Sequence, residues 1–94
     1  MRKVKIHSDT ASLIRKMHPH IKKKVRSSLE IIISKPHSGK ALKDELDGLW
    51  SFRVGRLRII YRVTAVVIEI IALGPRKAIY EETLRLIRKE KNDV

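Results

Sequence analysis

Cationic side chains alternate with apolar ones between Trp50 and Tyr61, and this pattern is the chain's strongest candidate for chemistry. A β-strand points successive side chains to opposite faces. The first half of the segment therefore places Ser51 and Arg53 on one face, which we expect to be wet and basic, and three apolar side chains on the core face. Guanidinium groups bind phosphate well because their planar fork matches its oxygens. The segment predicts a surface that binds polyanions.

Gly55 and Arg56 are predicted to form a two-residue type II′ turn, because glycine accepts the positive φ of the first position. Such a hairpin brings Arg53 and Arg58 near each other on one sheet surface. Two like charges at that distance repel, and a bound phosphate relieves the repulsion. We therefore expect Arg53 and Arg56 to bind phosphate beside Arg58.

The charge balance also favours an anionic partner. The 94 residues hold 22 Lys and Arg against 10 Asp and Glu, a formal net charge of +12. Nucleic acid is the favoured partner over an acidic protein or a membrane surface. A merely well-solvated basic surface is the alternative, and it applies equally to Lys22, Lys23, Lys24 and Arg26 on a predicted helix.

Other classes of site are disfavoured by what the sequence lacks. It has no cysteine, which excludes disulfides and thiolate metal sites. No apolar run is long enough for a membrane span, and the N-terminal segment lacks the apolar core of a signal peptide, so a cytoplasmic location is expected. The four histidines show no metal-site spacing, and we expect neither a metal nor a cofactor.

The periodicity predicts a single α+β domain over residues 1–94, with the tail 90–94 frayed. A strand at 3–7 precedes a short helix and a second helix from Pro19 to about Lys35, with an apolar stripe of Ile21, Val25, Leu29, Ile32 and Ile33. Strands follow at 49–54, 57–64 and 66–73, the last ended by Gly74 and Pro75, and then a helix at 79–91. The order β-α-α-β-β-β-α makes an N-terminal helical hairpin and a C-terminal helix on a four-stranded, antiparallel-rich sheet. Glu69 is expected to pair on the sheet surface.

A set of residues spread along the chain resembles the RelE/ParE superfamily of toxins from type II toxin-antitoxin pairs, and its RelE branch more than its ParE branch. The set comprises Leu42, Lys43, Leu46 and Gly48, then Trp50, Arg53 to Gly55 and Arg58 to Tyr61, then Gly74, Pro75, Arg76 and Tyr80. The match in order and spacing covers about residues 3–90. The resemblance implies a RelE-like fold, a compact antiparallel-rich sheet flanked by a helical hairpin.

The resemblance to the RelE branch also implies an activity and its partners. Members are endoribonucleases, or mRNA interferases, that cut messenger RNA on the ribosome and so inhibit translation. The substrate's own 2′-hydroxyl is the nucleophile, and no metal is required. A cognate acidic antitoxin would cover the basic face.

Site residues are implied by position. Arg58 and Arg76 would clamp the scissile phosphate, and Tyr80 would stack on a base or take part in proton transfer. The expected contacts to RNA come from a larger set: Arg53, Arg56, Lys43, Lys22, Lys23 and Arg26. Ser51 stands where some members carry a lysine proposed as the base, so the general base is unassigned.

Two other functions stay open at this stage. A protein of the ParE kind poisons DNA gyrase without cutting RNA, and the chain shares the Gly55 and Tyr61 pattern of that branch. A relative of the same fold that has lost toxicity is the second alternative. The ParE branch usually lacks the pattern that Gly74, Arg76 and Tyr80 form here, which disfavours the ParE hypothesis.

Overall fold

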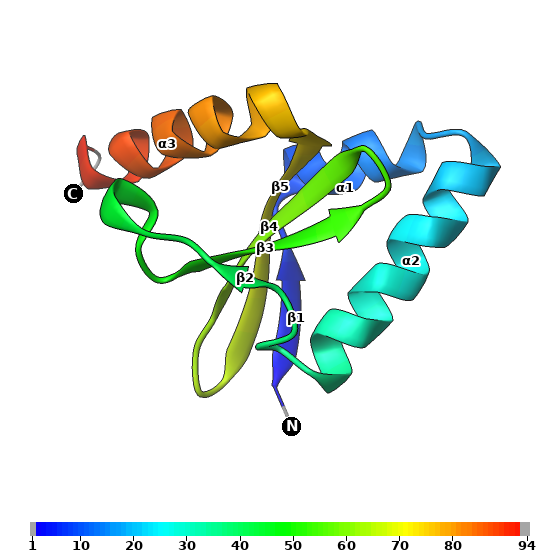
Figure 1. The fold of residues 1–94 in the computed structure, drawn as a ribbon, viewed down its shortest axis with the longest axis horizontal. Coiled ribbons are helices and arrows are strands. Elements are labelled where there is room, and N and C mark those ends of the chain that lie inside the picture. Colours follow the sequence, from blue (N-terminus) through cyan, green and yellow to red (C-terminus); the bar gives the residue numbers. More distant parts are fainter. Residues whose placement is uncertain (1, 93–94) are drawn as a thin grey trace.

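A five-stranded sheet with helices on both faces makes up the computed structural model, which describes residues 2–92 (Figure 1). The elements are β1 (Lys3–Ile6), α1 (Ser8–Arg15), α2 (Pro19–Ser34), β2 (Lys40–Ala41), the 3-10 helix η1 (Asp44–Leu46), β3 (Leu49–Val54), β4 (Leu57–Val63), β5 (Val67–Pro75) and α3 (Arg76–Asn92). The strands lie in the order β1-β5-β4-β3-β2, with β1 parallel to β5 and the other neighbours antiparallel. The α+β class and the helical hairpin are confirmed.

The predicted number of strands and the predicted boundary between the last strand and the last helix are wrong. The sheet has five strands rather than four, because Lys40 and Ala41 pair with β3 as a two-residue edge strand that is too short to show a period. The last strand continues through Pro75, and α3 begins at Arg76 rather than at Ile79. The predicted fraying of residues 90–94 reaches residues 93 and 94, which lie outside the described residues. It stays a prediction, as does the single-domain assignment.

One half of the core lies between the sheet and the α1-α2 hairpin. Val25 and Ile32 of α2 are fully buried against Ile59 and Tyr61 of β4. Ile21 and Ile33 were predicted on the same stripe, but they are 42% and 41% exposed. A helix that packs across a twisted sheet buries a narrower stripe than its apolar pattern indicates. Among residues 2–92, no helix has the length and apolar character that a membrane span needs.

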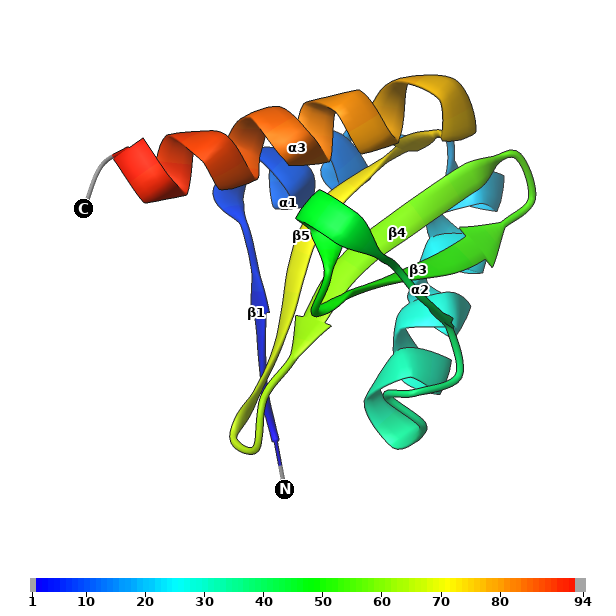
Figure 2. The same ribbon diagram turned by 60° about the vertical axis from the view of Figure 1, so that its left-hand side comes forward.

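The other half of the core lies under α3, which crosses the opposite face of the sheet (Figure 2). Leu49, Ile60 and Ile79 are at most 1% exposed there, and Ser51 is only 6% exposed. The expectation that this face of β3 is wet is therefore wrong over most of its length. Only the end nearest the β3-β4 turn stays open, and Arg53 and Arg58 lie at that end.

Glu69 is the one charged residue of β5, and it forms the ion pair expected of it. His7 Nε2 lies 2.6 Å from Glu69 Oε2, and Arg62 Nη1 donates to Glu69 Oε1 at 3.0 Å. Burial alone would raise the pKa of Glu69. The hydrogen bond to His7 and the positive charges of Arg62, His7 and Lys5 outweigh burial, so the pKa lies below its ordinary value.

The lowered pKa of Glu69 predicts a loss of stability in acid. Because the folded-state pKa is the lower one, the stabilisation is complete above about pH 4.5, the ordinary value, and is lost as the pH falls through the folded-state pKa. Glu69→Gln should lower the free energy of unfolding by about 1 kcal/mol at pH 7, a difference that shrinks towards pH 3. Urea unfolding across this range measures it. Glu45→Gln is the control, since its pair with Arg88 is 62% exposed on both sides. A constant difference from pH 7 to pH 3 would contradict the linkage.

Candidate phosphate-binding and catalytic site

The β3-β4 hairpin turns as predicted. Gly55 has a φ of +61°, whereas Arg56 is not in the left-handed region, as a type II′ turn requires. The register places Arg53 directly opposite Arg58, and Val54 opposite Leu57. Arg53 Nε donates to the Gly55 carbonyl oxygen at 3.2 Å, which holds its guanidinium at the tip of the hairpin.

Four arginines line a cavity of about 250 Å³ at this tip, which we call the arginine pocket. They are Arg53, Arg56, Arg58 and Arg76, with Gly55 between the first two. Arg58 is half-buried and the other three are exposed. Within residues 2–92, none of the four forms an ion pair with a carboxylate. Repulsion among four unpaired guanidinium groups favours a bound anion with several oxygens.

The start of α3 adds to the positive field of the arginine pocket. Arg76 is the first residue of the helix, whose first backbone N–H groups have no acceptor within the helix and whose dipole is positive at this end. A Cβ at Gly74 would lie 3.4 Å from Ile79 Cδ1, an ordinary van der Waals distance, so packing alone does not require glycine there. Gly74 also lies opposite Arg58 in the sheet. The Gly74, Arg76 and Arg58 positions of the sequence pattern therefore meet at one place.

Tyr80 reaches back from α3 to the sheet. Its Oη lies 3.3 Å from Ser51 Oγ, and the pair sits one row further along the sheet face than Arg53 and Arg58. Tyr80 is half-buried and follows Arg76 by one helical turn, so both side chains project from the same side of α3. The structure thus holds a phenol hydroxyl on a buried serine, one row of the sheet away from the arginine pocket, which Tyr80 itself does not line.

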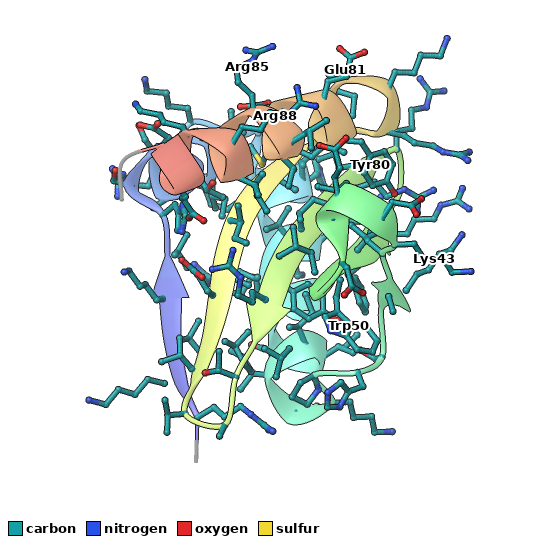
Figure 3. All side chains as sticks on the ribbon, turned by 90° about the vertical axis from the view of Figure 1, so that its left-hand side faces the viewer. Lys43, Trp50, Tyr80, Glu81, Arg85 and Arg88 are labelled. Atoms are coloured by element: carbon teal, nitrogen blue, oxygen red, sulfur yellow. The ribbon has the colours of Figure 1, made fainter. Side chains whose placement is uncertain are left out.

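The other predicted RNA-binding residues lie outside the arginine pocket. Lys43 is exposed on the loop before η1, on the same side of the molecule as Tyr80 (Figure 3). Lys22, Lys23 and Arg26 line a separate hollow of about 320 Å³ on α2. None of these four residues lines the arginine pocket itself.

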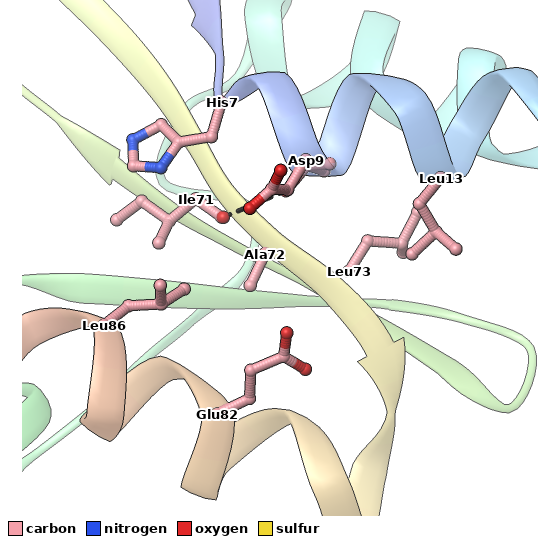
Figure 4. A pocket seen from close by; sticks show the side chains of 9 residues that line it. His7, Asp9, Leu13, Ile71, Ala72, Leu73, Glu82 and Leu86 are labelled. Atoms are coloured by element: carbon pink, nitrogen blue, oxygen red, sulfur yellow. Dashed lines mark hydrogen bonds between the residues drawn. The ribbon is translucent and has the colours of Figure 1, made fainter.

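A smaller cavity between α1, β5 and α3 has the opposite chemistry (Figure 4). Its volume is about 90 Å³, and Asp9 and Glu82 lie in its lining beside His7. Two carboxylates make it unsuited to a phosphate. In the described part of the chain, His7, Glu69 and Glu90 also bring three possible metal-ligand atoms within 4.8 Å of one another. Arg62 binds both of those carboxylates, so the group is an ion-pair network.

Comparison with known families decides the identity. The family model of the ParE toxin of type II toxin-antitoxin systems, parDE, matches residues 4–80. The chain belongs to this toxin family. It is a toxin of the RelE/ParE superfamily, as the residue pattern predicted. None of the curated proteins compared with it matches.

Solved structures of related toxins share the fold. The RelBE2 toxin-antitoxin complex of Mycobacterium tuberculosis is 26% identical, with a TM-score of 0.66 over 80% of this chain and 98% of that one. The archaeal RelE-RelB complex of Pyrococcus horikoshii is 24% identical, with a TM-score of 0.66 over 82% and 97%. A mutant of E. coli RelE in the free state has a TM-score of 0.74 at 17% identity, over 95% and 96%.

Sequence reasoning missed two features of the toxin's site. It did not place Ser51 against Tyr80, because the contact joins a strand to a helix that lies 29 positions away. It also did not place Lys24 in one groove with Arg53. Three adjacent lysines on a helix look alike in the sequence, and only the position of the hairpin separates them.

Proposed function

We propose that this toxin is a metal-independent endoribonuclease that cuts messenger RNA on the ribosome and thereby inhibits translation. The observation that carries the proposal is the arginine pocket, a hollow lined by four guanidinium groups that have no carboxylate partner among residues 2–92. The Tyr80 hydroxyl beside it adds a group able to hold or release a proton. Binding a phosphodiester at this place brings both kinds of group to one phosphorus atom.

The proposed reaction is an internal transfer within the RNA. The 2′-oxygen bonds to the adjacent phosphorus and loses its proton, while the bond from phosphorus to the 5′-oxygen breaks and that oxygen gains a proton. The products carry a 2′,3′-cyclic phosphate and a 5′-hydroxyl. Negative charge grows on the nonbridging oxygens in the transition state, where Arg58 and Arg76 stabilise it. Arg53 and Arg56 position the phosphate.

The partners follow from the same surface. Messenger RNA and the ribosome are polyanions, and the net charge of +12 favours association with both. A cognate acidic antitoxin would neutralise the toxin by covering the basic face. The RelE-RelB and RelBE2 structures are toxin-antitoxin complexes, which supports a partner of this kind. Because its proposed target is the ribosome, the toxin acts in the cytoplasm. The proposed reaction uses no cofactor.

A second candidate is the poisoning of DNA gyrase without RNA cleavage. The observation in its favour is the family model, which is that of ParE toxins. Arg58, Arg76 and Tyr80 would then have no substrate in common, and the arginine pocket would be a contact surface only.

Inducing the toxin alone in bacteria and mapping RNA 5′ ends on translating ribosomes separates the candidates. We expect cuts that keep a fixed phase with the codons, and 5′-hydroxyl ends at the cuts. DNA breaks without RNA cuts would favour the gyrase reading. Normal growth would show a fold relative that has lost toxicity.

A further inference from the structure

A groove runs between α2 and the tip of the β3-β4 hairpin. Its α2 side is formed by Lys23, Lys24, Ser27 and Ser28, and its hairpin side by Arg53, Val54 and Gly55. Its volume is about 420 Å³, larger than that of the arginine pocket. Lys23, Lys24 and Arg53 are exposed, and within residues 2–92 none of them pairs with a carboxylate.

This groove continues the arginine pocket. Arg53 and Gly55 line both, so the two hollows meet at the hairpin tip. Lys23 in turn lines both the groove and the hollow that Lys22 and Arg26 share further along α2. Three hollows thus form one path, and no acidic residue in the described part of the chain lines any of them. A single phosphate would occupy only the arginine pocket, so the path has room for more than one phosphate.

The lining of the groove selects the part of a nucleic acid that fits there. Lysine ammonium groups and serine hydroxyls are the side chains that typically contact phosphate and sugar oxygens. No aromatic ring lines the groove, so it offers no platform on which bases stack. The groove lies on the α2 side of the hairpin and the arginine pocket on the side of α3, so a strand that occupies both must bend around the tip. An unpaired strand follows such a bend far more easily than a stiff duplex does.

We infer that the groove holds the backbone phosphates next to the scissile one, so that the toxin binds an unpaired RNA strand of several nucleotides without reading its sequence there. This inference rests on the proposed function for the location of the scissile phosphate. It adds Ser27 to the binding surface and gives Lys24 a place beside Arg53. It also assigns the groove to the cleaved strand itself rather than to ribosomal RNA.

The test uses uncleavable oligonucleotides, 2′-O-methylated throughout, of two, four and six nucleotides. Wild-type affinity should rise several-fold between two and six nucleotides. Lys24→Ala should remove most of that rise while leaving dinucleotide binding unchanged. For the six-nucleotide ligand, the slope of log affinity against log salt should fall by about 0.7, the value for one lost phosphate contact on a single strand.

Lys35→Ala is the matched control, because it removes one exposed lysine that directly follows the C-terminal end of α2 and lines none of the three hollows. It should leave both the length dependence and the salt slope unchanged. A Lys24→Ala variant that binds all lengths like the wild type would overturn the inference. So would weaker binding to isolated ribosomal subunits with unchanged oligonucleotide binding, which would assign the groove to ribosomal RNA.

The outcomes separate this inference from the proposed function. The oligonucleotides report binding whether or not the toxin cuts RNA. Suppose that affinity rises with oligonucleotide length, that Lys24→Ala removes this rise, and that the toxin produces no cuts on ribosomes. This result would support the binding groove and contradict the proposed nuclease activity. Codon-phased cuts together with an affinity that does not change with oligonucleotide length would support the nuclease activity and contradict the binding groove.

Discussion

Arg58→Ala or Arg76→Ala should slow messenger-RNA cleavage by about a hundredfold to a thousandfold, the usual cost of one lost donor to a developing oxyanion. Ribosome binding should stay within a few fold, because many other cations share that contact. Both side chains line the arginine pocket from different elements, β4 and α3, so neither replaces the other. Single-turnover cleavage on programmed ribosomes measures the rate, and sedimentation with ribosomes measures the binding.

Two further variants make this result interpretable. Arg85→Ala removes an exposed arginine from the same helix as Arg76 but outside the pocket, and it should cleave normally (Figure 3). Arg58→Lys keeps the charge and loses the planar fork, so an intermediate rate is expected. Normal cleavage by either alanine variant would show that the residue does not clamp the phosphate. Because Arg58 is half-buried, its variants also need a check of the free energy of unfolding.

Local rules predicted the hairpin well. The alternation of β3 and β4 and the glycine of the turn are properties of neighbouring residues, and they place Arg53 opposite Arg58 without reference to the rest of the chain. Strand β2 was missed, because two residues have no measurable period and pair only once β3 is in place. The start of α3 was placed too late because Gly74 and Pro75 looked like a break, whereas the helix begins immediately after them.

Site residues were predictable only where they are close together in the sequence or belong to the family's residue pattern. Arg76 and Tyr80 came from the resemblance, and the structure places them beside the hairpin. The burial of Ser51 depends on α3 covering the sheet face, a tertiary packing that strand periodicity does not encode. The role of Lys24 depends likewise on how α2 lies against the hairpin tip.

Removing the Tyr80 hydroxyl should have the second large effect. In Tyr80→Phe the ring remains to pack or to stack on a base, so a loss of about a hundredfold in the cleavage rate would be due to proton transfer alone. Tyr61→Phe is the matched control. The Tyr61 Oη donates to the Pro36 carbonyl oxygen at 2.7 Å and accepts from the Gly39 N–H at 3.2 Å, which ties down the loop after α2. That variant should lose stability and cleave normally when folded.

A double-mutant cycle then tests whether Ser51 acts through Tyr80. Ser51 is too deeply buried to meet the RNA, and its one side-chain partner in the described structure is the Tyr80 hydroxyl, so it serves to position that group. Ser51→Ala alone should slow cleavage several-fold with little change in KM. In the Tyr80→Phe background the same change should cost nothing further, because the hydroxyl that Ser51 orients is already absent. Additive losses would mean that Ser51 matters only for packing. Normal cleavage by Tyr80→Phe would mean that the Tyr80 ring only stacks on a base and that groups of the RNA and water transfer the protons.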